Sequence, residues 1–108
     1  MTLNVNTAAS LMAMLGNTTR LQVVRLLVRA GPNGMAVGEI QRALGVPGST
    51  LSHHLSHLRH AGLIWQEREG PLLRCCVSYD LIDAIVSFLT DECCVGHSSE
   101  AGRKQAVE

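Results

Sequence analysis

The segment from residue 47 to residue 63, PGSTLSHHLSHLRHAGL, constrains the fold of this chain more than any other stretch. A proline–glycine pair opens it, and the hydroxyl of Ser49 can cap a new helix. Leu51, Leu55 and Leu58 then recur at helical spacing and form one narrow apolar stripe. Gly62 supplies the left-handed residue that commonly follows a helix end. The segment therefore predicts a short helix with a single buried face.

The other side of this helix carries small polar and cationic groups and no acidic residue. Hydroxyls, imidazoles and a guanidinium can reach phosphates and base edges in the major groove of DNA. By itself the pattern fits an ordinary surface helix equally well. The residues of this candidate DNA-reading face are Ser49, Thr50, Ser52, His53, Ser56, His57, Arg59 and His60, with His54 on its flank.

The flanking segments favour DNA binding. Residues 37–44, VGEIQRAL, predict a short amphipathic helix, and the glycine-containing turn 45–48 joins it to the helix above, which is the arrangement of a helix-turn-helix. Residues 63–69 and 72–79 predict two strands around Gly70 and Pro71, and therefore a hairpin. A hairpin directly after a recognition helix is a wing. The predicted fold is mainly α (α+β), a winged helix-turn-helix with a two-stranded wing.

The remaining segments supply three more helices and a tail. The first is centred on residues 8–15 and the second spans residues 18–30. The last runs from Leu81 to about Cys93, with Asp80 as its cap. Residues 97–108 are small and polar, which predicts a flexible tail. We therefore expect one domain, residues 1–96, followed by that tail.

The first and last helices have more apolar surface than a core of this size can cover. Packing them against the same helices of a second copy would bury that surface and form a two-fold dimer. The alternative is a compact monomer whose last helix folds onto its own core. A dimer also suits a palindromic operator, with two recognition helices one turn of DNA apart. The predicted interface residues are Leu11, Met12, Leu15, Ile82, Ile85, Val86 and Leu89.

Charge is balanced, with 9 basic and 9 acidic residues. A binder of phosphates normally has surplus cations, so this balance argues against DNA binding. Position weakens the objection, because four arginines and four of the five histidines fall in the DNA-facing half. Two of these arginines, Arg68 and Arg74, lie in the predicted wing and join the candidate DNA contacts; the other two are Arg42 and Arg59.

Composition limits location and chemistry. The chain shows neither a secretion signal nor a long apolar run, so we expect a cytoplasmic protein that does not span a membrane. Its four cysteines are then expected as reduced thiols. An enzyme is not expected, because the histidines cluster on one exposed helix face without a carboxylate at a fitting spacing.

Three segments together resemble the ArsR/SmtB family of metal- and metalloid-responsive repressors: NTTRLQVVRLL, GEIQRALGVPGSTLSHHLSHLRHAGLI and EREGPLLRCCVSY. The most specific part is SxHLxxLxxAGL, from Ser52 to Leu63. The resemblance extends over about residues 8–95. It implies a winged-helix homodimer, joined through its first and last helices, that leaves its operator when an inducer binds.

Two inducer sites of that family are missing here. The segment 35–39 lacks the CxC pair of one kind of arsenic sensor, and the last helix has Ile82 where zinc sensors have their first histidine. His97 and Glu100 have HxxE spacing, but they lie in the polar tail. The vicinal pair Cys93 and Cys94 looks like a further arsenical-sensing subclass.

The number of thiols bears on the inducer. Trivalent arsenic is soft and selects thiolates; arsenite can take three, whereas methylarsenite needs two. Cys93 and Cys94 supply two, so we expect arsenite or methylarsenite as inducer, with Cys75 or Cys76 as a possible third ligand. Otherwise one of these strand cysteines is a small core residue and the other is incidental. Alternatives for the same fold are a thiol-redox or persulfide sensor and a zinc or cadmium sensor.

Overall fold

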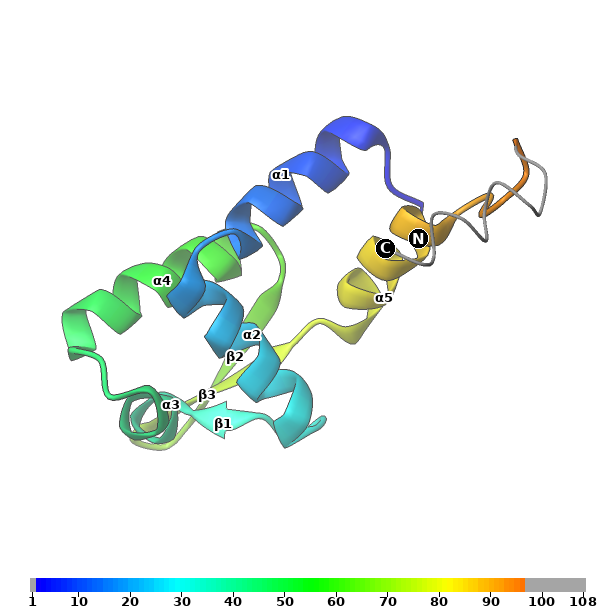
Figure 1. Cartoon of the computed structure of the whole chain (residues 1–108). Coiled ribbons are helices and arrows are strands. Elements are labelled where there is room, and N and C mark those ends of the chain that lie inside the picture. Colours follow the sequence, from blue (N-terminus) through cyan, green and yellow to red (C-terminus); the bar gives the residue numbers. More distant parts are fainter. Residues whose placement is uncertain (1, 97–108) are drawn as a thin grey trace.

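The computed structural model describes residues 2–96 of the chain. The expected tail, with His97 and Glu100, lies outside the described residues. The described part contains five helices and three strands, drawn in Figure 1. In chain order they are α1 (Val5–Leu15), α2 (Thr18–Ala30), β1 (Met35–Ala36), α3 (Val37–Leu44), α4 (Gly48–His60), β2 (Ile64–Glu69), β3 (Leu72–Val77) and α5 (Tyr79–Thr90).

The core forms around the apolar stripe of α4. Leu51 and Leu58 are fully buried and Leu55 is nearly so, as the spacing predicted. This stripe packs against α2 and β2, and α2 in turn packs against α1, α3 and β3. Leu27 of α2 and Ile40 of α3 are also fully buried. The winged helix-turn-helix fold is confirmed.

The sheet has one more strand than predicted. Its order is β1-β3-β2, and both pairings are antiparallel. The wing hairpin is β2 and β3 with Glu69 opposite Leu72, while the two-residue β1 adds to the outer edge of β3. The predicted two-stranded wing is confirmed. The sequence did not reveal β1, because two residues are too short to show the alternation that marks a strand.

Two predicted helix caps were wrong. No side chain caps α4: its cap position is Pro47, two residues before the predicted cap, so Ser49 lies in its first turn. The cap of α5 is Ser78, whose hydroxyl accepts a hydrogen bond from the backbone N–H of Leu81 at 3.3 Å, and Asp80 lies inside the first turn. Both aspartate and serine suit a cap, so the sequence pattern did not distinguish them.

The last helix ends at Thr90, three residues before the expected end at Cys93. Asp91 has extended backbone angles, and Glu92 and Cys94 have positive φ of 57° and 69°. Two carboxylates next to the negative end of a helix dipole are unfavourable there. Residues 91–96 therefore form turns, and the two adjacent cysteines lie in this segment.

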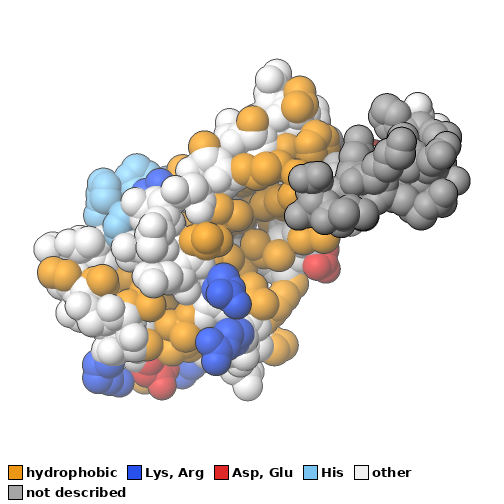
Figure 2. Space-filling view, in the orientation of Figure 1, with side chains coloured by type: hydrophobic (Ala, Val, Ile, Leu, Met, Phe, Trp, Pro, Cys, Tyr) orange, Lys and Arg blue, Asp and Glu red, His pale blue; other side chains and the backbone are white. Residues whose placement is uncertain are grey.

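The predicted dimer residues divide into covered and uncovered ones. Leu11 and Ile85 are buried in the subunit's own core, where α1 and α5 meet. Val86 and Leu89 are 56% and 63% exposed, while Met12, Leu15 and Ile82 are half-buried. Figure 2 shows hydrophobic side chains gathered over α1, α2 and α5. Among residues 2–96, no helix combines the length and apolarity needed to cross a membrane.

We expect Gly34→Ala to destabilise the protein more than Gly45→Ala. The two glycines have matching φ values, +66° and +67°, so an alanine at either site incurs the same strain, about 1–2 kcal/mol. A Cβ at Gly45 meets open space, whereas at Gly34 it would press on the Cys75 carbonyl oxygen and lie 2.7 Å from the Cys76 sulfur. Overpacking of this kind adds about 1–3 kcal/mol. Urea unfolding measures both variants, and equal losses would contradict the close approach to β3.

Candidate nucleic-acid interface and cysteine pair

Within residues 2–96, most of the outer face of α4 is exposed. Because the three leucines fix the opposite face in the core, the polar side chains point outward as predicted. Figure 2 shows the histidines gathered over this helix. Of the eight candidate residues, Ser56 is half-buried, and the exposed ones are Ser49, Thr50, Ser52, His53, His57, Arg59 and His60.

The imidazoles on this face contact one another and the helix backbone. Nε2 of His53 lies 3.1 Å from Nε2 of His57, one helical turn later. Nδ1 of His60 lies 2.8 Å from the carbonyl oxygen of Ser56, which accepts its hydrogen bond. Several of these side chains are thus ordered on the helix surface and present polar edges outward.

His54 has a different environment from the other histidines. Nη1 of Arg20 lies 3.4 Å from Nδ1 of His54, and Nε of Arg20 donates to the carbonyl oxygen of Met14 at 2.6 Å. Burial, with the nearby guanidinium of Arg20 and the other imidazoles, lowers the pKa of His54 below its usual 6.5. Arg20 therefore ties α4 to α2 and to the end of α1. Sequence reasoning missed this link, since a pair 34 residues apart carries no local signal.

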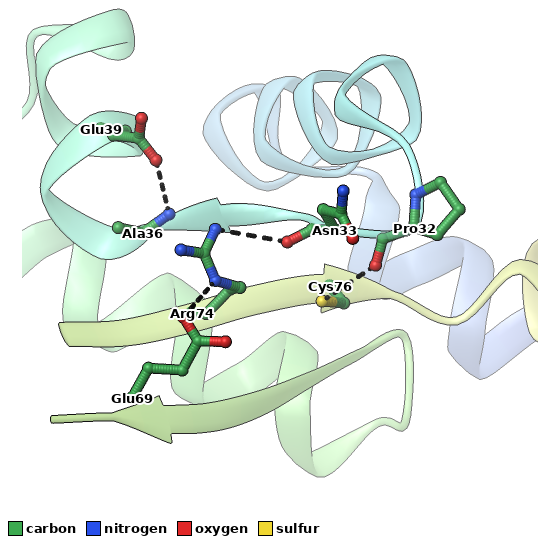
Figure 3. Close-up of polar contacts among 7 residues, drawn as sticks. All are labelled: Pro32, Asn33, Ala36, Glu39, Glu69, Arg74 and Cys76. Atoms are coloured by element: carbon green, nitrogen blue, oxygen red, sulfur yellow. Dashed lines mark hydrogen bonds and ion pairs between the residues drawn. The ribbon is translucent and has the colours of Figure 1, made fainter.

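The two arginines of the wing differ. Arg68 is exposed, which suits a contact with DNA. Nε of Arg74 donates to the Glu69 carboxylate at 2.9 Å, and its Nη1 donates to the carbonyl oxygen of Asn33 at 3.3 Å (Figure 3). The ion pair raises the pKa of Arg74. Arg74 thus joins the wing to the turn before β1, and a role for it on DNA stays a prediction.

Cys75 and Cys76 are both buried, at 0% and 4% exposure. The alternative interpretation, in which one of them is a small buried residue, fits Cys75, and Cys76 is buried as well. The Cys75 sulfur belongs to the main core and accepts a hydrogen bond from Nε2 of Gln66 at 3.3 Å. The Cys76 thiol lies 3.6 Å from the carbonyl oxygen of Pro32, to which it donates (Figure 3). Burial raises the pKa of both thiols. Protonated and enclosed, they are poor ligands in the folded subunit.

Cys93 and Cys94 are exposed, and their sulfurs lie 3.2 Å apart. The hydrogen bond and charge of Cys93 raise the pKa of Cys94, because a proton shared between two sulfurs is lost less easily. If one atom were bound to both sulfurs with bonds of about 2.3 Å, the length of a zinc–thiolate bond, the sulfur–atom–sulfur angle would be roughly 90°. That angle suits pyramidal trivalent arsenic better than tetrahedral zinc. Within residues 2–96, no three His, Cys, Asp or Glu side chains form a cluster that could hold a metal ion.

Comparisons with known proteins agree with this architecture. A family model described as a helix-turn-helix domain matches residues 15–66. The transcriptional activator HlyU of Vibrio cholerae is 30% identical over 82 residues, which cover 76% of this chain and 73% of HlyU. Its solved structure superposes with a TM-score of 0.66 and 30% identity, over 87% of this chain and 99% of that one.

Two further relatives are similar in fold or in sequence. A homodimeric winged helix-turn-helix domain from Mycobacterium bovis, Mb0332, described as a possible ArsR-family regulator, has a TM-score of 0.64 at 28% identity, over 82% of each chain. A putative arsenical resistance operon repressor, ArsR of Halobacterium salinarum, is 37% identical over 59 residues, 55% of this chain and 45% of that protein.

The recognition helix, the wing and these relatives define the class: a winged helix-turn-helix transcriptional regulator that binds DNA and is not an enzyme. More narrowly, the chain belongs to the ArsR family.

We expect stability to fall with acid partly through His54. The pKa of His54 is lowered in the folded state, so the unfolded chain binds a proton at this residue first as the pH drops through 6.5. Protonation of His54 therefore favours the unfolded chain, and the free energy of unfolding falls below neutral pH. His54→Gln should therefore show a smaller fall in Tm between about pH 7.5 and about pH 5. His60→Gln, an exposed histidine of the same helix, is the control and should keep the wild-type fall. An unchanged fall in His54→Gln would contradict this assignment.

Proposed function

We propose that the protein is a homodimeric repressor that leaves its operator DNA when trivalent arsenic binds Cys93 and Cys94. The observation that carries the proposal is the pair of exposed sulfurs 3.2 Å apart, in the turns that follow α5. The name of the Halobacterium relative, an arsenical resistance repressor, supports the choice of inducer.

Binding to the operator rests on α4. Its hydroxyls and imidazoles are exposed and would contact base edges, while the exposed Arg59 and, in the wing, Arg68 would contact phosphates. The balanced net charge predicts only a small number of phosphate contacts per subunit. Affinity should therefore depend on two subunits binding together rather than on a strong general attraction to DNA.

Dimerisation supplies that second subunit. Within residues 2–96, Val86 and Leu89 are exposed and form an apolar stripe of α5 beside α1, and the M. bovis relative with this fold is homodimeric. Packing α1 and α5 of one subunit against those of its partner would cover the stripe. A two-fold axis through this interface would present the recognition helices to successive major grooves on one face of the DNA.

We expect release of the operator because the two thiols lie close to the proposed dimer interface. Trivalent arsenic bound to both sulfurs would fix the turns 91–96, which adjoin the exposed end of α5 and hence the proposed interface. Methylarsenite needs only these two thiols; arsenite would take its third ligand from elsewhere, such as hydroxide. A small change in the angle between subunits would move the recognition helices off their half-sites. A coupling of about 1–3 kcal/mol is typical of such linkage.

We expect Arg59→Ala to weaken binding to the natural operator and Arg29→Ala to leave it unchanged. Both residues are exposed arginines, but Arg59 lies on α4 and Arg29 at the end of α2. Each phosphate contact that is lost reduces the slope of log affinity against log salt concentration by about 1. Fluorescence anisotropy over a salt series measures this slope. Equal effects of the two variants would contradict the assignment of α4 as the reading helix.

We expect the double variant Cys93→Ser, Cys94→Ser to bind operator like the wild type but to stay bound when methylarsenite is added. Each single variant should also lose most of the response, because a two-sulfur chelate becomes a single bond. Anisotropy of operator-bound protein follows the release, and sedimentation velocity checks that every variant stays dimeric. Release of the double variant by methylarsenite would overturn the site, and a monomer in the wild type would overturn the proposed assembly.

The same experiment separates the alternative inducers. Release by peroxide or a persulfide, without any response to arsenicals, would replace the proposal with a thiol-redox sensor. Release by zinc or cadmium alone would replace it with a metal sensor. Wild-type protein is titrated with each compound separately, with the double serine variant as the matched control.

A further inference from the structure

The histidine pair on α4 has the geometry of a metal chelate. His53 and His57 are one helical turn apart, so their side chains lie on the same side of the helix. Their Nε2 atoms are 3.1 Å apart and both rings are exposed. The ring planes are nearly perpendicular, at 82°, with centroids 4.4 Å apart. The two nitrogens therefore meet edge to edge and are open to solvent.

This separation matches two imidazoles bound to one ion. With metal–nitrogen bonds of about 2.0–2.1 Å, nitrogens 3.1 Å apart subtend roughly 100° at the metal. That value lies between the octahedral and tetrahedral angles, so either geometry is accessible. Imidazole is a ligand of Zn²⁺, Ni²⁺ and Cu²⁺, and an exposed site leaves the remaining positions to water.

The helix holds the pair in place before any metal arrives. Leu51, Leu55 and Leu58 are buried on the opposite side, which fixes the orientation of α4. His54 is held separately by Arg20, and His60 by the Ser56 carbonyl oxygen, so neither belongs to the pair. From this geometry we propose that His53 and His57 form a two-histidine binding site for a divalent transition-metal ion on the recognition helix.

The position of the site gives it a consequence for DNA binding. A metal ion would engage the nitrogens of His53 and His57 that otherwise face the groove, and its bound waters would occupy the space of the base edges. Metal and operator should then compete, each weakening the other by the same factor. This consequence rests on the proposed function, whereas the metal site itself does not require DNA.

The experiment titrates Ni²⁺ into the full-length Cys93→Ser, Cys94→Ser variant without DNA, followed by calorimetry. Removing the exposed thiols leaves the imidazoles as the exposed donors that suit Ni²⁺. We expect one Ni²⁺ per subunit, with affinities in the order Mn²⁺ below Co²⁺ below Ni²⁺. His57→Gln or His53→Gln in this background should weaken binding by about 100-fold, because the second imidazole acts at high effective concentration. Circular dichroism confirms that the variants stay folded.

His60→Gln is the matched control, since it removes an exposed imidazole of the same helix that lies outside the pair. It should keep full Ni²⁺ affinity. Equal affinity in His57→Gln and the parent, an equal loss in His60→Gln, or no binding by the parent would each overturn the site. Adding operator afterwards tests the competition separately, so that a failure of DNA binding leaves the result for the metal site intact.

Discussion

The structure depends on the burial of one side of α4. Leu51, Leu55 and Leu58 reach the centre of the core, where α2 and β2 meet them. Burying three leucines contributes roughly 1.5–3 kcal/mol each, and it fixes which side of the helix faces outward. The polar side of α4 does not pack in the core, so its imidazoles and hydroxyls face outward. Arg20 adds a polar link across the same packing.

Much of this arrangement was predictable because it is local. The bounds of α2 and α3 and the wing turn follow from apolar spacing and from Gly and Pro punctuation. The predictions were wrong or incomplete where two neighbouring residues were equally good candidates, or where the structure depends on contacts between distant segments. Ser78 and Asp80 are both good caps, and only the course of the chain after β3 decides for Ser78. The strand β1 exists because Gly34 allows the chain to pass close beside β3.

The candidate sites show the same division. Helical periodicity placed the outward residues of α4, but it did not show that Arg74 is held by Glu69 and Asn33. The end of α5 was extended too far, because Cys93 continued an apolar spacing that the carboxylates of Asp91 and Glu92 interrupt. As a result the two thiols lie in irregular turns and not on a helix. In these turns their sulfurs approach to 3.2 Å. Adjacent residues on a regular helix point in different directions.

The alternation of β3 places Cys75 and Cys76 on opposite faces of one strand, each enclosed by a different part of the fold. A reagent that attacks thiols reaches the fully buried Cys75 only when the hairpin separates from the core, whereas Cys76 keeps 4% exposure beside the Pro32 turn. The outer pair near α5 needs no such opening. The native chain thus contains both exposed and buried thiols, and the rate at which Cys75 is modified reports local opening of the wing without any engineered cysteine.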